Sequence, residues 1–117
     1  MVDTNDEWIM TRIGIKERRI LKDEGLGTSF LGGKAVDELI EKADTDPDSV
    51  DAVLFATCTP DYAFPSTASL VCKHAGIKNA MAMDIEAACS GFLFAMDTAS
   101  ALIESGRYKK IIVIGGD

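Results

Sequence analysis

Short apolar runs and helix-spaced apolar stripes alternate along most of the chain. Three runs have the length of buried strands: VDAVLFATC (50–58), NAMAMDIEA (79–87) and KKIIVIGG (109–116). Three segments carry apolar side chains at helical spacing: 28–43, 66–76 and 90–105. Helices that alternate with strands through short links indicate crossover connections in a parallel sheet. The pattern therefore predicts an α/β fold with a mostly parallel sheet flanked by helices.

The segment 90–105 has the clearest helical pattern. Its apolar side chains form one stripe: Phe92, Ala95, Met96, Ala99, Leu102 and Ile103. Asp97, Ser100 and Glu104 fall on the other side of the same helix. We therefore expect this helix to pack on the sheet through that stripe.

The start of the chain departs from this alternation. TNDEWIMTRIG (4–14) predicts a short helix that Thr4 or Asn5 caps and Gly14 ends. IKERRILKDEGLG (15–27) is expected to be extended at first and then a loop.

Composition limits the possible functions. The chain has 117 residues, enough for one domain over residues 1–117, and its formal net charge of -7 disfavours a nucleic-acid binder. No apolar run approaches the length of a membrane span, and no signal peptide opens the chain. The three cysteines show no C-x-x-C spacing and the single histidine is His74, so neither a disulfide framework nor a metal site is expected. Reduced thiols in the cytoplasm are the simplest interpretation.

Cys89 is the candidate nucleophile. If a strand ends near Ala88 and a helix begins near Ser90, the thiol lies at a strand-to-helix corner. The unpaired amides and the positive end of the helix dipole favour a thiolate there, and the same amides suit an oxyanion. The alternative is a buried structural cysteine, which is what most lone cysteines are.

The other candidate side chains have simpler explanations. Cys72 lies on an apolar helical stripe and Cys58 follows a strand, so we expect both to pack in the core. His74 lies off the stripe beside Lys73, which favours a surface position over a catalytic one.

Four segments in register carry a resemblance to a known family: DEWIMTRIGIKERRI, AFPS, DIEAACSGF and IIVIGGD. Together they closely resemble the β-ketoacyl-acyl-carrier-protein synthase III family, which has the thiolase fold and starts fatty-acid synthesis. The resemblance implies that Cys89 takes an acyl group from acetyl-CoA or another short acyl-CoA. The carbanion left when malonyl-acyl-carrier protein loses CO2 then attacks this acyl-cysteine. No cofactor is implied, because the CoA thioester is a substrate.

The resemblance also assigns binding roles. Trp8 and Arg12 match the CoA-binding helix of the family, and Thr4 matches a position near the nucleotide. Phe64 matches an aromatic side chain that crosses a homodimer interface to wall the partner's acyl pocket. Judged without the resemblance, Trp8 is a packed side chain beside a solvated Arg12, and Phe64 is a packing anchor.

The chain matches only the N-terminal portion of that fold. The family has an opening strand ahead of this sequence, between the strands that match 50–58 and 109–116, and it has a further last strand. Its catalytic histidine and asparagine lie in a C-terminal half, and His74 does not match the histidine motif. We therefore expect a partial domain that neither folds stably nor completes the condensation alone.

Two other functions stay open. The first alternative to the fatty-acid enzyme is a thiolase-fold condensing enzyme of secondary metabolism. The second is a non-catalytic piece that dimerises or binds carrier protein. The basic cluster of Lys16, Arg18 and Arg19 would suit an acidic carrier protein or CoA phosphates. A solvated charged surface is the simpler explanation of that cluster.

Overall fold

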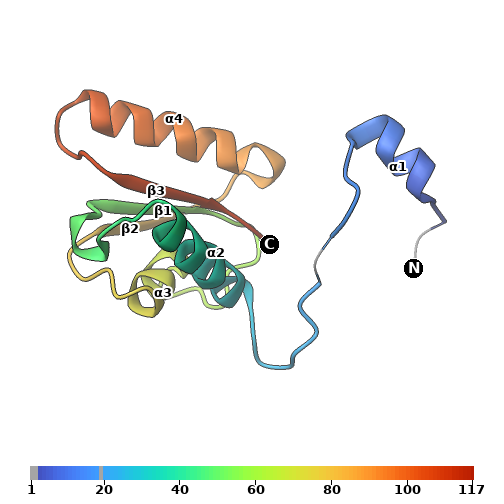
Figure 1. Ribbon diagram of the computed structural model, residues 1–117, viewed down its shortest axis with the longest axis horizontal. Helices are drawn as coiled ribbons and strands as arrows, with labels where there is room; N and C mark the ends of the chain where they lie inside the picture. Colours follow the sequence, from blue (N-terminus) through green and yellow to red (C-terminus); the bar gives the residue numbers. More distant parts are fainter. Residues whose placement is uncertain (1–2, 19) are drawn as a thin grey trace.

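The computed structural model describes residues 3–18 and 20–117, and its helices and strands follow the predicted order (Figure 1). The helices are α1 (Asp6–Ile13), α2 (Thr28–Lys42), α3 (Thr67–His74) and α4 (Gly91–Glu104), with single 3-10 turns at Pro47–Ser49 and Ala88–Ser90. The strands are β1 (Ala52–Ala56), β2 (Met81–Ile85) and β3 (Ile111–Gly115). Each helix and strand lies inside the range that the sequence pattern predicts for it.

The sheet is parallel throughout, in the order β2-β1-β3. Ala52 of β1 is in register with Met81 and Ile111 on its two sides. β1 is buried along all five of its residues, as expected for the middle strand of a parallel sheet.

The pairing of β1 with β3 corrects one expectation. The family resemblance implied a missing strand between them, but the two strands pair directly from Ala52 to Ala56 along β1. Both strands are apolar and parallel, so direct pairing satisfies the backbone groups that a gap would leave open. The unpaired edges expected between these strands, which were the reason for expecting instability, are therefore absent.

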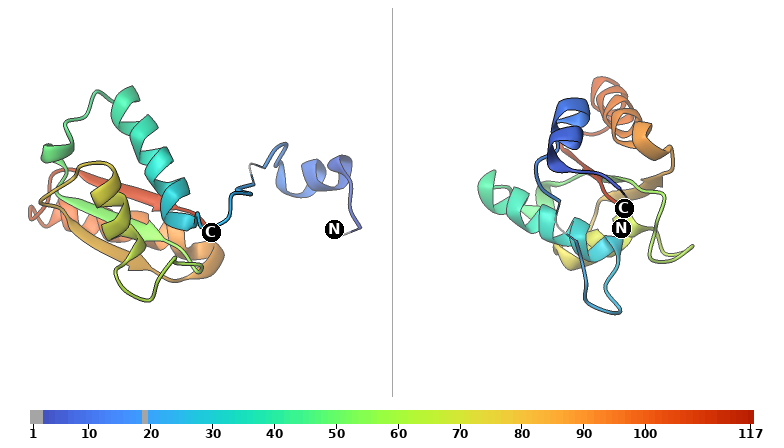
Figure 2. Two further views of the ribbon diagram at one scale, coloured as in Figure 1. Left: turned by 90° about the horizontal axis from the view of Figure 1, so that it is seen from below. Right: turned by 90° about the vertical axis from the view of Figure 1, so that its right-hand side faces the viewer.

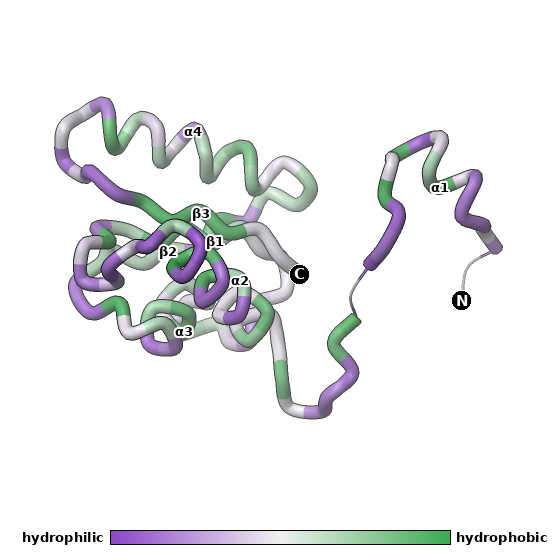
Figure 3. Tube along the Cα trace, in the orientation of Figure 1, coloured by the Kyte–Doolittle hydropathy of each residue, from purple (hydrophilic) through white to green (hydrophobic). Residues whose placement is uncertain are grey.

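Helices cover both faces of the sheet (Figure 1). Alternate residues of β1 point to opposite faces: Val53 and Phe55 pack with α2 and α3, whereas Leu54 packs with α4. The apolar segments of the chain accordingly run along the strands and along α4 (Figure 3). The result is a three-layer arrangement with one core on each side of the sheet.

The structure confirms the predicted stripe of α4 at Ala95 and Ala99 and differs from it at the larger side chains. Gly91, Ala95 and Ala99 are the buried residues of this helix, whereas Phe92 and Met96 are about half exposed. The smallest side chains face the sheet because they allow the helix axis to approach it closely. The predicted stripe is therefore rotated from the true contact face, and the larger apolar side chains lie along its flanks.

α1 stands apart from the sheet and from the helices that cover it (Figures 1 and 2). Asn5 caps this helix by accepting a hydrogen bond from the Trp8 amide (2.9 Å), and Gly14 ends it with φ +69°. The described residues of 15–27 connect α1 to α2 without a further helix or strand. Among the described residues, no helix is long and apolar enough to cross a membrane.

Gly32 is the point of closest contact between α2 and the sheet. A methyl group at Gly32 would overlap the ring of Phe55 and lie 3.2 Å from Cγ2 of Val71. The Phe55 side chain is completely buried and has no room to move away. At Gly33 a methyl group would instead meet the ring of His74, which is partly exposed.

We predict that Gly32→Ala destabilises the protein by about 2 kcal/mol, the usual cost of overpacking a rigid core. Gly33→Ala is the matched control, because both variants gain about 1 kcal/mol of helix propensity, but the new methyl group at Gly33 meets the partly exposed His74 instead of the buried Phe55. Urea unfolding of the two variants measures the difference. Equal stability of the two variants would contradict the proposed contact.

Candidate active site

A sharp corner follows β2 and carries Cys89. The strand ends at Ile85, and Ala88–Ser90 form a single 3-10 turn that leads into α4 at Gly91. Ala88 has φ +46°, in the left-handed region that side chains other than glycine rarely adopt. Backbone strain of this kind is common at functional sites. The predicted corner is thus confirmed, with the strand ending three residues before Ala88.

Small residues let this corner lie directly on the ends of β1 and β3. A Cβ atom at Gly91 would lie 3.2 Å from that of Ala56, the last residue of β1. A Cβ atom at Gly115 would lie 3.0 Å from Cδ2 of Phe92. Together these residues surround a cavity of about 360 Å³, lined by Ala56, Ala88, Cys89, Phe92 and the segment 115–117.

The start of α4 has no side-chain cap. Neither Ala87, before the turn, nor Ser90, before α4, supplies a side-chain capping hydrogen bond. Within the turn, the Ser90 amide donates to the Ala87 carbonyl (3.1 Å) and the Gly91 amide donates to the Ala88 carbonyl. The positive end of the helix dipole lies at the same place. Cys89 itself is exposed. The corner therefore offers an accessible thiol at the positive end of a helix dipole, which favours negative charge.

The other two cysteines differ from each other. Cys72 is buried in α3, where desolvation raises the pKa of its thiol, so its predicted core position is confirmed. The prediction for Cys58 is wrong, because this residue is exposed. β1 ends at Ala56, and Cys58 therefore lies in the segment beyond the strand.

His74 contacts α2 rather than the Cys89 cavity. Its Nε2 atom lies 2.8 Å from Oδ2 of Asp37, and this contact, as a hydrogen bond, is the main cause that lowers the pKa of Asp37. The predicted exposure is confirmed in part, since about a third of the side chain is accessible. No group of three or more metal-ligating side chains is placed to hold an ion in the part of the chain that the structure describes.

The predicted nucleotide-binding residues come together on α1. The Arg12 guanidinium carbon lies 4.4 Å from the centroid of the Trp8 ring, as their spacing of four residues predicts. Thr4 and Trp8 also line one cavity of about 430 Å³ with Arg18. Arg19, the third residue of the basic cluster, lies outside the described residues.

The structure does not bring these residues to Cys89. The cavities beside α1 do not include Cys89 among their described lining residues, and α1 stands apart from the sheet (Figure 2). Lys16 and Arg18 are exposed. The candidate nucleophile and the candidate nucleotide site are therefore two separate places on the chain.

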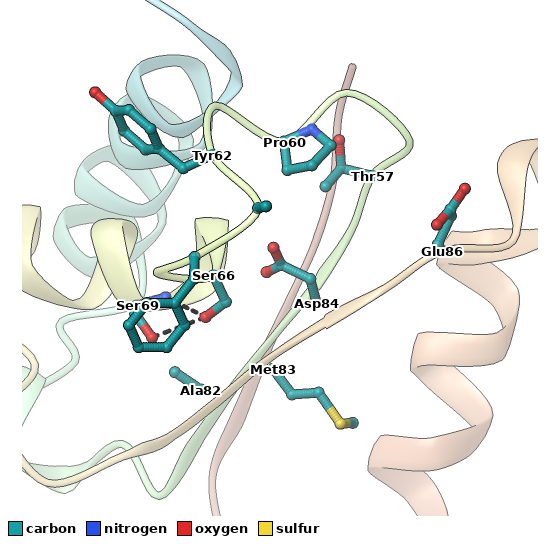
Figure 4. Close-up of a pocket in the computed structure, with 11 residues that line it drawn as sticks. Thr57, Pro60, Tyr62, Ser66, Ser69, Ala82, Met83, Asp84 and Glu86 are labelled. Carbon is teal, nitrogen blue, oxygen red and sulfur yellow. Dashed lines mark hydrogen bonds between the residues drawn. The ribbon is translucent and has the colours of Figure 1, made fainter.

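Phe64 lies in the segment 57–66 and is 88% exposed. It lines a cavity of about 520 Å³ together with Tyr62, Asp84 and Glu86 (Figure 4). This cavity is larger than the one at Cys89 and does not include that residue. The predicted role of Phe64 across a dimer interface stays a prediction, because a single chain is present.

Asp84 anchors the end of this segment to the sheet. From β2 its carboxylate accepts hydrogen bonds from the amides of Thr67 (2.6 Å) and Ala68 (2.8 Å) at the start of α3. Ser66 caps the same helix by accepting from the Ser69 amide, and the two hydroxyls also share a hydrogen bond (2.8 Å; Figure 4). The Phe64 segment thus ends at a fixed point beside β2.

Sequence reasoning missed two aspartates of this region, Asp84 and Asp117. The contacts of Asp84 span 16 and 17 residues of sequence, and those of Asp117 span 58 to 60. No local spacing signals contacts of that range. The one available signal was that each aspartate lies near or just after the end of a strand, where side chains can reach neighbouring segments.

Comparison with known proteins now adds to this geometry. The family model for 3-oxoacyl-[acyl-carrier-protein] synthase III matches residues 83–117, the segment that contains the corner. Over all 117 residues the chain is 63% identical to β-ketoacyl-[acyl-carrier-protein] synthase III of Phocaeicola vulgatus. The chain therefore matches an N-terminal portion of this synthase III family. It spans 35% of the length of that relative.

Solved structures agree with the synthase III assignment. The crystal structure of 3-oxoacyl-[acyl-carrier-protein] synthase III from Aquifex aeolicus superposes with a TM-score of 0.83 and 47% identity, covering 97% of this chain and 36% of that one. The priming β-ketosynthase of the R1128 polyketide biosynthetic pathway superposes with a TM-score of 0.81 and 33% identity, covering 97% of this chain and 34% of that one. The predicted thiolase-like fold, represented here in part, is confirmed.

We predict that Asp84→Ala destabilises the protein by about 1–2 kcal/mol, the usual cost of removing a helix-capping side chain. Glu86→Ala is the matched control, because Glu86 is an exposed acidic residue of the same cavity. Thermal unfolding of both variants measures the effect. A loss as large in Glu86→Ala would show that cavity charge, and not capping, decides the stability.

Proposed function

We propose that this chain is the part of a condensing enzyme that carries the acylated cysteine. In this proposal Cys89 takes an acetyl or other short acyl group from acyl-CoA, and malonyl-acyl-carrier protein is the second substrate. The observation that carries the proposal is the exposed Cys89 at the strained corner, beside uncapped amides and within the family-matched segment.

The proposed reaction has two steps. The Cys89 thiolate attacks the thioester carbonyl, the amides at the start of α4 stabilise the oxyanion, and CoA leaves as its thiolate. The malonyl group of the second substrate then loses CO2, and the resulting carbanion attacks the acyl-cysteine and releases the Cys89 thiolate. No cofactor is needed, because the energy of the acyl group is kept in a thioester throughout.

Decarboxylation needs groups that the described part of this chain does not place at Cys89. Neither a histidine nor an asparagine lines the Cys89 cavity. We therefore infer that the chain alone does not complete the condensation. In the complete protein, the family resemblance supports a histidine and an asparagine from a C-terminal half, a homodimer with Phe64 at its interface, and a cytoplasmic location.

A second candidate is a condensing enzyme of secondary metabolism. The likeness to the R1128 priming β-ketosynthase favours it. The two candidates share the chemistry at Cys89 and differ in the acyl group that they accept. A series of acyl-CoA substrates of increasing length separates them, since a fatty-acid primer enzyme prefers the short members.

The test of the proposal is the intact mass of the protein before and after exposure to acetyl-CoA. We predict one added acetyl group, mapped to Cys89, and no adduct in Cys89→Ser. Cys58→Ser is the matched control, because Cys58 is an exposed cysteine outside the corner and its loss should leave acylation intact. An adduct that maps to Cys58, or that survives in Cys89→Ser, would exclude Cys89 as the nucleophile.

The proposed CoA site on α1 makes a separate prediction. Trp8→Ala should raise the acyl-CoA concentration for half-maximal acylation about tenfold, because stacking on a base contributes about 1–3 kcal/mol. The maximal rate should change little, since Trp8 lies apart from the Cys89 cavity. Met10→Ala, on the same helix and also exposed, serves as the control. An unchanged half-maximal concentration in Trp8→Ala would place the nucleotide elsewhere.

A further inference from the structure

The side chain of Asp117 reaches back from the end of β3 to the segment that follows β1. Its Oδ1 atom accepts three hydrogen bonds: from the Cys58 amide (2.6 Å), the Thr57 hydroxyl (3.1 Å) and the Thr59 hydroxyl (3.3 Å). These hydrogen bonds lower the pKa of the Asp117 carboxyl, and the bond from the Cys58 amide has the largest effect. The carboxylate is therefore ionised at neutral pH and acts as a charged acceptor, which makes each bond stronger than a neutral one.

This join forms one wall of the Cys89 cavity. Asp117 lines that cavity with Gly116 and Ala56. The backbone continues the same connection, because the Gly116 amide donates to the Ala56 carbonyl (3.1 Å). On the other side of β1, the Thr57 amide donates to the carbonyl of Ile85, the last residue of β2 (3.1 Å). The position of the wall relative to the thiol therefore depends on how the ends of β1 and β3 are held together.

The same segment continues toward two other parts of the molecule. The Thr59 carbonyl accepts a hydrogen bond from the Thr28 hydroxyl (2.7 Å) at the start of α2. In the other direction the chain leads from Thr59 to Phe64. Asp117 thus holds the base of the segment that carries Phe64 as well as the wall beside Cys89.

Asp51 makes a corresponding connection at the opposite end of the same two strands. Its carboxylate accepts hydrogen bonds from the amides of Lys109 (2.7 Å) and Lys110 (2.9 Å), ahead of β3. Those hydrogen bonds lower the pKa of the Asp51 carboxyl as well, and the bond from the Lys109 amide has the largest effect. Because β1 and β3 are parallel, Asp51 joins their first ends and Asp117 their last ends. Only Asp117 lines the Cys89 cavity.

We propose that Asp117 is a positioning residue for the reaction at Cys89, whose carboxylate fixes the β1–β3 wall of the cavity. The inference rests on the proposed function and deepens it. Asp117 acts through the backbone and hydroxyl groups of 57–59 and transfers no proton. Misplacing a bound substrate by about 1 Å can slow a reaction about 100-fold, so the loss of one such join has a measurable effect.

The test compares three variants in the protein at its natural length: Asp117→Ala, Asp117→Asn and Asp51→Ala. The rate of acetyl transfer from acetyl-CoA to Cys89 is followed by intact mass over a range of concentrations and of pH. Thermal unfolding of each variant is measured beside it. Asn keeps one carbonyl oxygen in place of the carboxylate, so it retains an acceptor of the same shape.

We expect Asp117→Ala to lower the maximal rate about tenfold or more, with a smaller change in the half-maximal concentration. Asp117→Asn should restore most of the rate and keep the pH profile of the unchanged protein. Asp51→Ala should lose thermal stability as Asp117→Ala does. Its rate of acetyl transfer should stay within about twofold of the unchanged protein, because Asp51 joins the strands at the end away from Cys89.

Three results would overturn the inference. An unchanged maximal rate in Asp117→Ala would show that the join does not position the cavity. An equal loss in Asp51→Ala would show a general loosening of the sheet. A pH limb that vanishes in Asp117→Asn would make Asp117 a proton-transfer group.

The inference remains testable if the proposed function fails. In that case the unchanged protein takes up no acetyl group, and the rate of Cys89 alkylation by iodoacetamide is compared instead. A rate altered in Asp117→Ala and not in Asp51→Ala would uphold the role of Asp117 in shaping the cavity. Equal rates in all variants would overturn it.

Discussion

The close approach of α4 to β1 is the contact on which the candidate site depends. Gly91, Ala95 and Ala99 face the sheet, and a Cβ atom at Gly91 would already lie 3.2 Å from that of Ala56. Larger side chains at these positions would lift the helix and carry the Cys89 turn away from the strand ends. The same small residues therefore pack the core between α4 and the sheet and place the candidate nucleophile at the strand ends.

Carboxylates hold this arrangement together where the elements end. Asp51 and Asp117 join β1 to β3, Asp84 caps α3 from β2, and Asp61 accepts the Ser29 amide (3.1 Å) at the start of α2. In each case a charged acceptor satisfies backbone donors that no regular structure reaches. The excess of acidic residues behind the net charge of -7 thus includes a structural part, and charge alone would not have revealed it.

The sequence pattern predicted the order and type of the elements because apolar spacing records which residues face a core. It failed where the outcome depends on size or on distant partners. The predicted stripe of α4 was right at Ala95 and Ala99 but also included Phe92 and Met96, because hydrophobicity does not show that the sheet requires the smallest residues at the contact. Cys58 was assigned to the core because strand ends are uncertain by one or two residues, enough to move a side chain into solvent. The joins of Asp84 and Asp117 lie beyond any local pattern.

α1 is a short helix that is stabilised by its own residues. A helix of eight residues is marginal without support, and here the support is internal: the Asn5 cap, the Gly14 end and the stacking of Arg12 on Trp8. A planar ligand that stacks on the same face of the Trp8 ring must displace Arg12 from it. That displacement costs about 0.5–1 kcal/mol of cation–π energy, which a hydrogen bond from the freed guanidinium to a phosphate more than offsets. The proposed nucleotide site on this helix would therefore favour ligands that pair an aromatic ring with a nearby anion over ligands that offer the ring alone.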